Sequence, residues 1–331
     1  MLFREDDVAR AEAAAVRTNA GWFRWTHDLV ELSGPDAEKF LDWVLVNKIA
    51  GLLAGQGKYT TMLDEEGGII DDLVVMRKSE DTWWLSTLYG PHMCAWFDEH
   101  KGDYDIAYAD RTQDFDMYAV QGPNSATIMN KVLAAPVDGL KRFQLLETEL
   151  EGCKVTVDRG GFTGELGFEV YCTREVSQAV AAAIGAAAEA EGAPRLTTLE
   201  VYVRSLPMEK GLALRQDYKG LTPFEANLGW SVHMDKDFVG KQALEAAQEA
   251  GPARAFVGLE IERESYEDIC QNEIIRKRGV PVGVCRQMIY GYTVDKNIGF
   301  GIVDAKKVPL GTQVTIGPND SPAVVVEPKW C

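Results

Sequence analysis

Two strand-like runs joined by an acidic, glycine-containing turn constrain the fold of this chain more than any other segment. Residues 58–63 and 73–76 are dominated by apolar, aromatic and β-branched side chains, which favours strands. Three acidic residues and then Gly67 and Gly68 stand between them, and this combination is a strong turn signal. The segment therefore predicts a β-hairpin, with Asp71 and Asp72 just ahead of the second apolar run.

The rest of the chain alternates short strands with helices. Strong helix formers predict a helix over 7–17, and a second helix over 197–213 is expected to bend at Pro207. From residue 255 onward, short strands alternate with Gly and Pro turns, which predicts a small all-β domain. A natural boundary precedes it at 248–252. The pattern is typical of the α+β class.

Charge and composition exclude some classes of function. The 331 residues include 34 Lys and Arg against 51 Asp and Glu, so the formal charge is −17. With 46% apolar and 26% charged residues, we expect a soluble globular protein of two or three domains. The acidic balance argues against a protein that tracks nucleic acid, because phosphate contacts need clustered Lys and Arg. An anionic small molecule stays possible, since one local cation outweighs the global field.

Several site classes lose their support at this stage. The six cysteines include no C-x-x-C pair and the four histidines no H-E-x-x-H pair, so we expect no metal site. Dinucleotide, Walker and G-x-S-x-G motifs are also absent. The sequence contains no apolar run of about 18 residues, the length that a membrane-spanning helix needs. Its polar, acidic start is unlike a secretory signal. A cytoplasmic protein is therefore expected.

Three long motifs resemble the folate-dependent glycine-cleavage T-protein (aminomethyltransferase) superfamily. Residues 62–75, MLDEEGGIIDDLVV, are similar to the family's M-x-N-E-x-G-G-I-x-D-D-L-x-V hairpin. Residues 159–169, RGGFTGELGFE, are similar to R-T-G-Y-T-G-E-x-G-F-E. The third motif is TPFEANLGW at 222–230, followed by KDFVGK at 236–241. Their order follows the family from about residue 10 to 245, with a fainter match to the end.

This resemblance implies a three-domain cloverleaf with tetrahydrofolate in a central channel. Residues 1–28 and 113–248 would form a discontinuous folate-binding domain. Residues 29–112 would form an inserted α+β domain that carries the hairpin, and residues 249–331 a C-terminal β-barrel domain.

Two carboxylates carry the expected chemistry. Asp72 matches the family carboxylate near N5 and N10 of folate, where it can stabilise positive charge and relay a proton. The alternative is that it only caps the turn. Asp71 is expected on the opposite face of the strand. Glu169 matches the residue that holds the pterin, since a carboxylate accepts from its 2-amino and N3–H groups.

Five further residues are candidates for holding folate. Tyr59 matches a family tyrosine and Phe162 replaces one, so either ring can pack on the pterin or benzoyl group. For both, and for Trp230, core packing is the alternative. Arg159 can contact the glutamate tail of folate or form a salt bridge, and Arg204 lies one residue from a family arginine.

The residues expected on the donor side depart from the T-protein. Val203 and Pro207 stand at family arginine positions, and residues 290–296 replace a family loop. We therefore predict transfer of a methyl group from a small O-, N- or S-methyl donor to N5 of tetrahydrofolate. The residues proposed to contact that donor, by stacking or cation–π interaction, are Tyr89, Trp25, His27, Tyr290 and Tyr292.

Two alternatives stay open. The first is the aminomethyltransferase of the glycine cleavage system, which would need a lipoyl carrier protein as partner. The second is a folate-binding module without turnover, a branch that carries a K-G-C-Y-x-G-Q-E signature. The corresponding stretch, 217–223, lacks that signature, and together with Asp72 this favours an enzyme. The sequence leaves the donor, the product (5-methyl- or 5,10-methylenetetrahydrofolate) and the oligomeric state undetermined.

Overall fold

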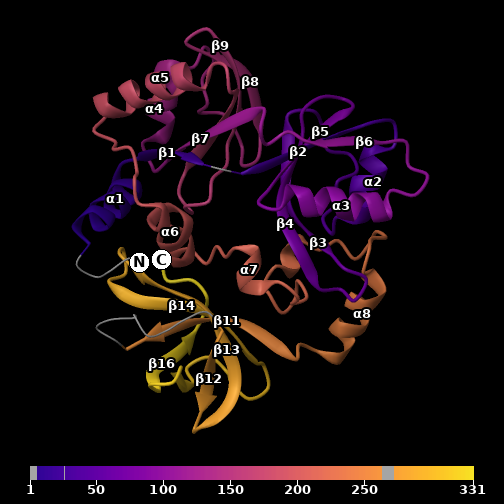
Figure 1. Ribbon diagram of the computed structural model, residues 1–331, viewed down its shortest axis with the longest axis vertical. Helices are drawn as coiled ribbons and strands as arrows, with labels where there is room; N and C mark the ends of the chain where they lie inside the picture. Colours follow the sequence, from indigo (N-terminus) through magenta and orange to yellow (C-terminus); the bar gives the residue numbers. More distant parts are fainter. Residues whose placement is uncertain (1–5, 26, 263–271) are drawn as a thin grey trace.

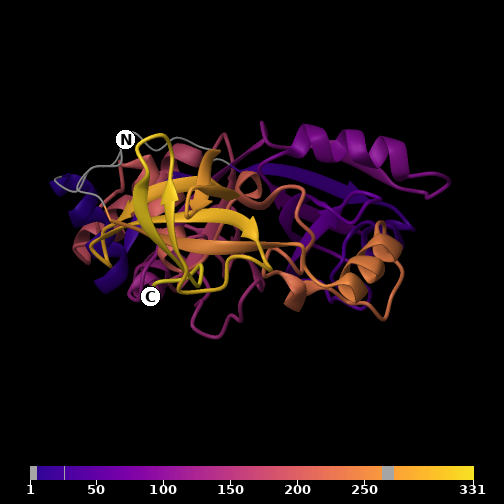
Figure 2. The same ribbon diagram turned by 90° about the horizontal axis from the view of Figure 1, so that it is seen from below.

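Three lobes surround a central segment. The computed structural model describes residues 6–25, 27–262 and 272–331. Two open sheets and a closed barrel occupy the lobes (Figure 1). Turned by 90°, the molecule is flat, with the lobes side by side rather than stacked (Figure 2). The predicted N-terminal helix is present as α1 (Asp7–Thr18), whose first turn is capped by the Asp6 carboxylate accepting from the backbone N–H of Ala9 at 2.9 Å.

The first lobe is an antiparallel sheet covered on one face by two helices. Side chains alternate along its strands, so that Phe168 and Val170 pack under the helices while Glu169 and Tyr171 face the centre of the molecule. The strands in spatial order are β1 (Gly21–Trp25), β7 (Phe115–Gln121), β10 (Gly167–Thr173), β9 (Cys153–Asp158) and β8 (Leu145–Leu150), and the helices are α4 (Ser125–Val132) and α5 (Ser177–Ala190).

The second lobe contains the predicted hairpin. Its two strands are longer than expected and pair antiparallel around a turn in which Gly67 has φ 80°, a conformation that favours glycine. Leu73 and Val75 pack beneath the helices, and Val74 faces the centre. The strands in spatial order are β3 (Gln56–Leu63), β4 (Ile69–Arg77), β5 (Thr82–Thr87), β2 (Asp28–Ser33) and β6 (Ala107–Asp110), and the helices are α2 (Ala37–Val44) and α3 (Gly90–His100).

The third lobe is a closed antiparallel barrel, which confirms the prediction of a small all-β unit after residue 255. The barrel closes where β11 pairs with β16. Its strands in spatial order are β11 (Arg254–Ile261), β14 (Lys296–Asp304), β13 (Val280–Gly291), β12 (Glu273–Lys277), β15 (Gln313–Ile316) and β16 (Ser321–Val326).

Short helical turns fill the space between the lobes. The helix predicted over 197–213 is present but shorter: residues 199–209 are helical, and they include a π-helical turn, η1 (Val201–Ser205), followed by one α-helical turn, α6 (Leu206–Glu209). Pro207 has no N–H to donate, and it stands in the first turn of α6, where the π-helical turn changes to an α-helical one. The remaining elements are α7 (Arg215–Tyr218), η2 (Gly229–Ser231) and α8 (Lys241–Ala250).

The fold agrees with the expected cloverleaf, whereas the residue boundaries proposed for its three domains stay a prediction. Within the described ranges, no helix is long and apolar enough to cross a membrane. No three His, Cys, Asp or Glu side chains in the same ranges lie close enough together to hold a metal ion. Five cysteines are free thiols, and Cys270 lies outside the described residues.

Candidate active site

A cavity of about 320 Å³ lies where the three lobes meet the central segment. Both sheets contribute strand residues to its wall, the central segment contributes loops and α7, and the barrel contributes Phe256. Its polar and aromatic lining residues are Trp25, His27, Tyr59, Asp71, Asp72, Ser86, Thr87, Tyr89, Arg142, Phe143, Asp158, Phe162, Glu169, Tyr218, Asn227, Trp230 and Phe256.

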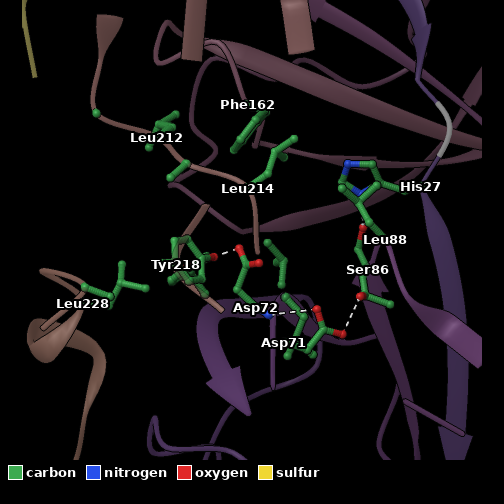
Figure 3. A pocket seen from close by; sticks show the side chains of 18 of the residues that line it. His27, Asp71, Asp72, Ser86, Leu88, Phe162, Leu212, Leu214, Tyr218 and Leu228 are labelled. Carbon is green, nitrogen blue, oxygen red and sulfur yellow. Dashed lines mark hydrogen bonds between the residues drawn. The ribbon is translucent and has the colours of Figure 1, made fainter. Parts of the chain in front are cut away.

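Asp72 stands at one end of this cavity, beside two tyrosines. The Tyr59 hydroxyl donates to Oδ2 of Asp72 at 3.2 Å. Tyr218 lies beside the same carboxylate (Figure 3), and its hydroxyl is buried. The backbone N–H of Ile69 donates to the carbonyl of Leu221, and that of Gly220 donates to the carbonyl of Ile69, which holds the segment after α7 against the hairpin. Burial raises the pKa of Asp72 to about 6, and the tyrosine hydroxyls oppose that rise.

Asp71 has a different set of partners. Its Oδ2 accepts from the Thr87 hydroxyl at 2.7 Å, and its Oδ1 accepts from the backbone N–H of Asp72 at 2.9 Å. Burial, and then the charge of Asp72, raise the pKa of Asp71 to about 7. Strand alternation turns this carboxylate away from Asp72, yet Asp71 still lines the cavity (Figure 3). Two neighbouring carboxylates with raised pKa values are typical of a functional site.

A second acidic pair lies on the sheet of the first lobe. Glu169 on β10 is directly opposite Asp158 on β9, and both side chains line the cavity. Burial raises the pKa of Glu169 to about 7 and raises that of Asp158 well above its usual value, with the charge of Glu169 as the next cause for Asp158. Such a pair does not ionise twice near neutral pH.

Hydrogen bonds connect this pair to His27. The Tyr171 hydroxyl, which also interacts with Glu169, donates to Oγ of Ser86 at 3.2 Å. Oγ of Ser86 lies 2.7 Å from Nδ1 of His27. Burial lowers the pKa of His27 to about 3, so its ring is neutral at physiological pH and can accept or donate one hydrogen bond on each nitrogen.

Aromatic rings supply flat walls. Tyr59 stacks on Trp230, with centroids 5.6 Å apart and an interplanar angle of 24°. Trp230 is 68% exposed, so core packing does not account for it. Trp25 and Phe162 lie 6.0 Å apart between ring centroids, and both line the cavity.

Not every candidate from the sequence reaches the cavity. Arg204 forms an ion pair with buried Asp217 at 2.9 Å, so its guanidinium is paired within the protein rather than directed to the cavity. Tyr290 and Tyr292 are buried, and both rings face the Arg10 guanidinium at 5.7 and 5.5 Å. These three residues and Arg159 are not among the lining residues.

Tyr89 does line the cavity, but its ring carries the Arg215 guanidinium at 3.8 Å. The face of that ring is therefore already occupied by a protein cation.

Several lining residues had not been singled out from the sequence, among them Asp158, Tyr218 and Arg142. Asp158 had a signal, since Val155 and Val157 alternate with polar residues in the strand just before the glycine-containing motif at 159–169. Tyr218 and Arg142 lie in loops or short turns, where spacing says nothing about direction. Only the packing of these segments against the two sheets brings them to the cavity.

Comparison with known proteins gives a consistent result. The description "GCVT N-terminal domain" matches residues 3–236, and "Glycine cleavage T-protein C-terminal barrel domain" matches residues 254–330. A protein named aminomethyltransferase from Bacillus velezensis is 34% identical over 322 residues, covering 93% of this chain and 85% of its own. Another from Clostridium botulinum is 33% identical over 319 residues, covering 92% and 84%.

A solved structure has the same fold. The glycine cleavage system aminomethyltransferase T from Bartonella henselae superposes with a TM-score of 0.85 at 26% identity, covering 96% of this chain and 88% of its own. This match confirms the expected mixed α and β cloverleaf with its terminal barrel. It also agrees with the expectation of an enzyme rather than a folate-binding module. The chain belongs to the glycine-cleavage T-protein family of tetrahydrofolate-dependent transferases.

Proposed function

We propose that this protein is an aminomethyltransferase that passes a one-carbon unit to tetrahydrofolate. The donor would be an aminomethyl group held on a sulfur atom of a lipoyl carrier protein. Carbon–sulfur and carbon–nitrogen bonds break, and the carbon becomes the methylene bridge between N5 and N10 of folate. The hydrogens of N5 and N10 leave as protons, one to the sulfur and one to the departing ammonia. No oxidant is required.

The observation that carries this proposal is the setting of Asp72. A carboxylate whose pKa is raised to about 6 is largely ionised at neutral pH, yet it is basic enough to receive a proton. Loss of the sulfur or the amine leaves positive charge on the one-carbon unit, and an anion in a cavity stabilises that charge more strongly than water does. The Tyr59 hydroxyl holds the carboxylate in position.

Glu169 and the aromatic walls fit the folate. The pterin ring offers two N–H donors on one edge, and Glu169 is a buried carboxylate that lines the cavity with no arginine or lysine partner among the described residues. The rings of Phe162, Trp25 and Tyr59 supply apolar faces for a flat ligand. Tetrahydrofolate would thus lie between the Glu169 end and the Asp72 end.

The choice of donor changes from the methylated compound predicted from the sequence. That prediction depended partly on aromatic residues that would grip a methylated donor. Tyr290 and Tyr292 lie outside the lining, and the ring of Tyr89 is covered by Arg215. The full-length relatives at 33–34% identity carry the name aminomethyltransferase, which supports the alternative. The lipoyl carrier partner and a cytoplasmic location belong to this proposal.

A reconstituted assay tests the proposal. The purified protein is incubated with tetrahydrofolate and an aminomethyl-loaded lipoyl carrier protein, and 5,10-methylenetetrahydrofolate and ammonia are measured. We expect equal amounts of both products and none without the carrier. A parallel panel of O-, N- and S-methyl donors is followed for 5-methyltetrahydrofolate. Product from that panel, with none from the carrier, would overturn the proposal in favour of a demethylase.

A further inference from the structure

Asp158 and Glu169 form a buried acidic pair, and Asp158 has as yet no assigned role. The two residues are directly opposite each other on antiparallel strands β9 and β10. Side chains in such positions share a face, with Cβ atoms about 4.5–5.5 Å apart. Asp158 is 1% exposed and Glu169 is 7% exposed. A Cβ atom on Gly160 would lie 2.4 Å from Oδ2 of Asp158 and 3.7 Å from Oε2 of Glu169, so both carboxylates converge beside this glycine.

Asp158 lacks the partners that buried carboxylates normally have. Oδ1 of Asp158 is buried and accepts no hydrogen bond. No arginine, lysine or histidine of the described residues forms a salt bridge with either carboxylate. Leaving a buried polar atom unpaired costs about 1–3 kcal/mol, and more if it is charged. Because both side chains line the cavity, a bound ligand can supply the missing partners.

The surrounding charges determine how many protons the pair holds. Glu169 and Tyr171 on β10 face Asp158, while Arg159 at the end of its own strand and Arg142 from the segment before β8 act against the rise in its pKa. Burial and the charge of Glu169 outweigh both arginines. Two like charges this close do not ionise together near neutral pH, so the pair carries one proton and one negative charge.

We propose that Asp158 keeps this proton and donates a hydrogen bond to a ring acceptor of the ligand, while ionised Glu169 accepts from two N–H groups. The two residues together then recognise a ring edge on which a pair of N–H donors stands beside an acceptor. This inference rests on the proposed function, because the aminopyrimidinone edge of tetrahydrofolate has this pattern. Asp158 is thereby a specificity residue and makes binding depend on one proton.

The proposal predicts how affinity changes with pH. Above the range in which the pair holds its proton, Asp158 becomes an anion, loses its donor and repels Glu169, so ligand binding must be accompanied by uptake of a proton. The dissociation constant should then rise toward tenfold per pH unit. Asp158→Asn has a similar shape and an amide N–H that donates at every pH, so its affinity should stay flat as the pH rises.

Calorimetry with tetrahydrofolate under anaerobic conditions between pH 6 and 9 tests this. Asp158→Ala, which has no donor, should bind roughly tenfold more weakly than wild type at pH 7. Glu149→Gln is the matched control, because Glu149 is an exposed carboxylate on β8 of the same sheet. It should follow the wild type. Circular dichroism establishes that each variant is folded.

Counting the protons taken up on binding tests the proposal directly, and the wild type alone can refute it. Binding heats in buffers of different ionisation enthalpy give the number of protons taken up, which should approach one at high pH for wild type and zero for Asp158→Asn. If wild type binds folate without proton uptake, or if Asp158→Asn has the same pH dependence as wild type, the role of Asp158 is refuted and the proposed function stands. If wild type ignores millimolar tetrahydrofolate at every pH, the proposed function itself fails, and this inference with it.

Discussion

Removing the Tyr59 hydroxyl should move the acid limb of the pH–rate profile. The hydroxyl donates to Asp72, and a hydrogen bond to the charged form of an acid lowers its pKa. Tyr59→Phe deletes that donor but keeps the ring that stacks on Trp230. The ionised form of Asp72 therefore becomes less favourable, and its pKa rises above about 6.

The expected size of the shift follows from the geometry. A hydrogen bond to a charged group contributes about 1.5–3 kcal/mol. At 3.2 Å this one is longer than the optimum for a hydroxyl and a carboxylate, so the lower value applies. One pKa unit corresponds to about 1.4 kcal/mol, so the limb should move up by about one unit. At pH 6.5 turnover should then fall about threefold, and at pH 8.5 it should hardly change.

The assay is kcat for methylenetetrahydrofolate formation from pH 5 to 9 with both substrates saturating. Tyr118→Phe is the control, because Tyr118 is also buried but donates to or accepts from Ser177 under the helices, outside the cavity. Its profile should match the wild type. An acid limb that stays in place in Tyr59→Phe, or moves to lower pH, would refute the assignment of this limb to Asp72.

Four further outcomes follow from the same structure. Asp72→Asn should lower turnover, measured by steady-state kinetics, far more than folate affinity, measured by calorimetry, because the charge acts on a transition state. Glu169→Ala should weaken folate binding about ten- to a hundredfold by calorimetry, since a charge-assisted contact is lost. Asp71→Asn should raise the melting temperature at pH 8 but not at pH 4. The folded-state pKa of Asp71 is raised to about 7, so the stability that its neutral form gives below pH 4 is lost as the pH rises through 7. Asparagine cannot ionise and so avoids that loss. Trp83→Ala should cost about 3–5 kcal/mol in urea unfolding, because Trp83 is 1% exposed in the second lobe; a loss below 1 kcal/mol would contradict its place in that core.

The local elements of this chain could be predicted because their causes are local. Adjacent glycines after acidic residues determine a turn at any place in a fold, and the hairpin forms where expected. Side-chain alternation along β4 predicted opposite directions for Asp71 and Asp72, although both line the cavity, and short strands alternating with turns after residue 255 predicted the all-β unit. The helix predicted over 197–213 shows the limit, since the structure shortens it to 199–209 and makes part of it π-helical.

The composition of the site was decided by tertiary structure. Asp158 becomes the neighbour of Glu169 only through the register of β9 with β10, and Tyr218 meets Asp72 only because α7 is held against the hairpin. Arg204, one residue from a family arginine in sequence, turns instead to Asp217. Spacing along the chain reports on neighbours within one element, whereas a cavity between lobes depends on contacts between residues far apart in sequence. The sequence alone thus determined which chemical groups are available to the site. The packing of the lobes determined which of these groups contact one another.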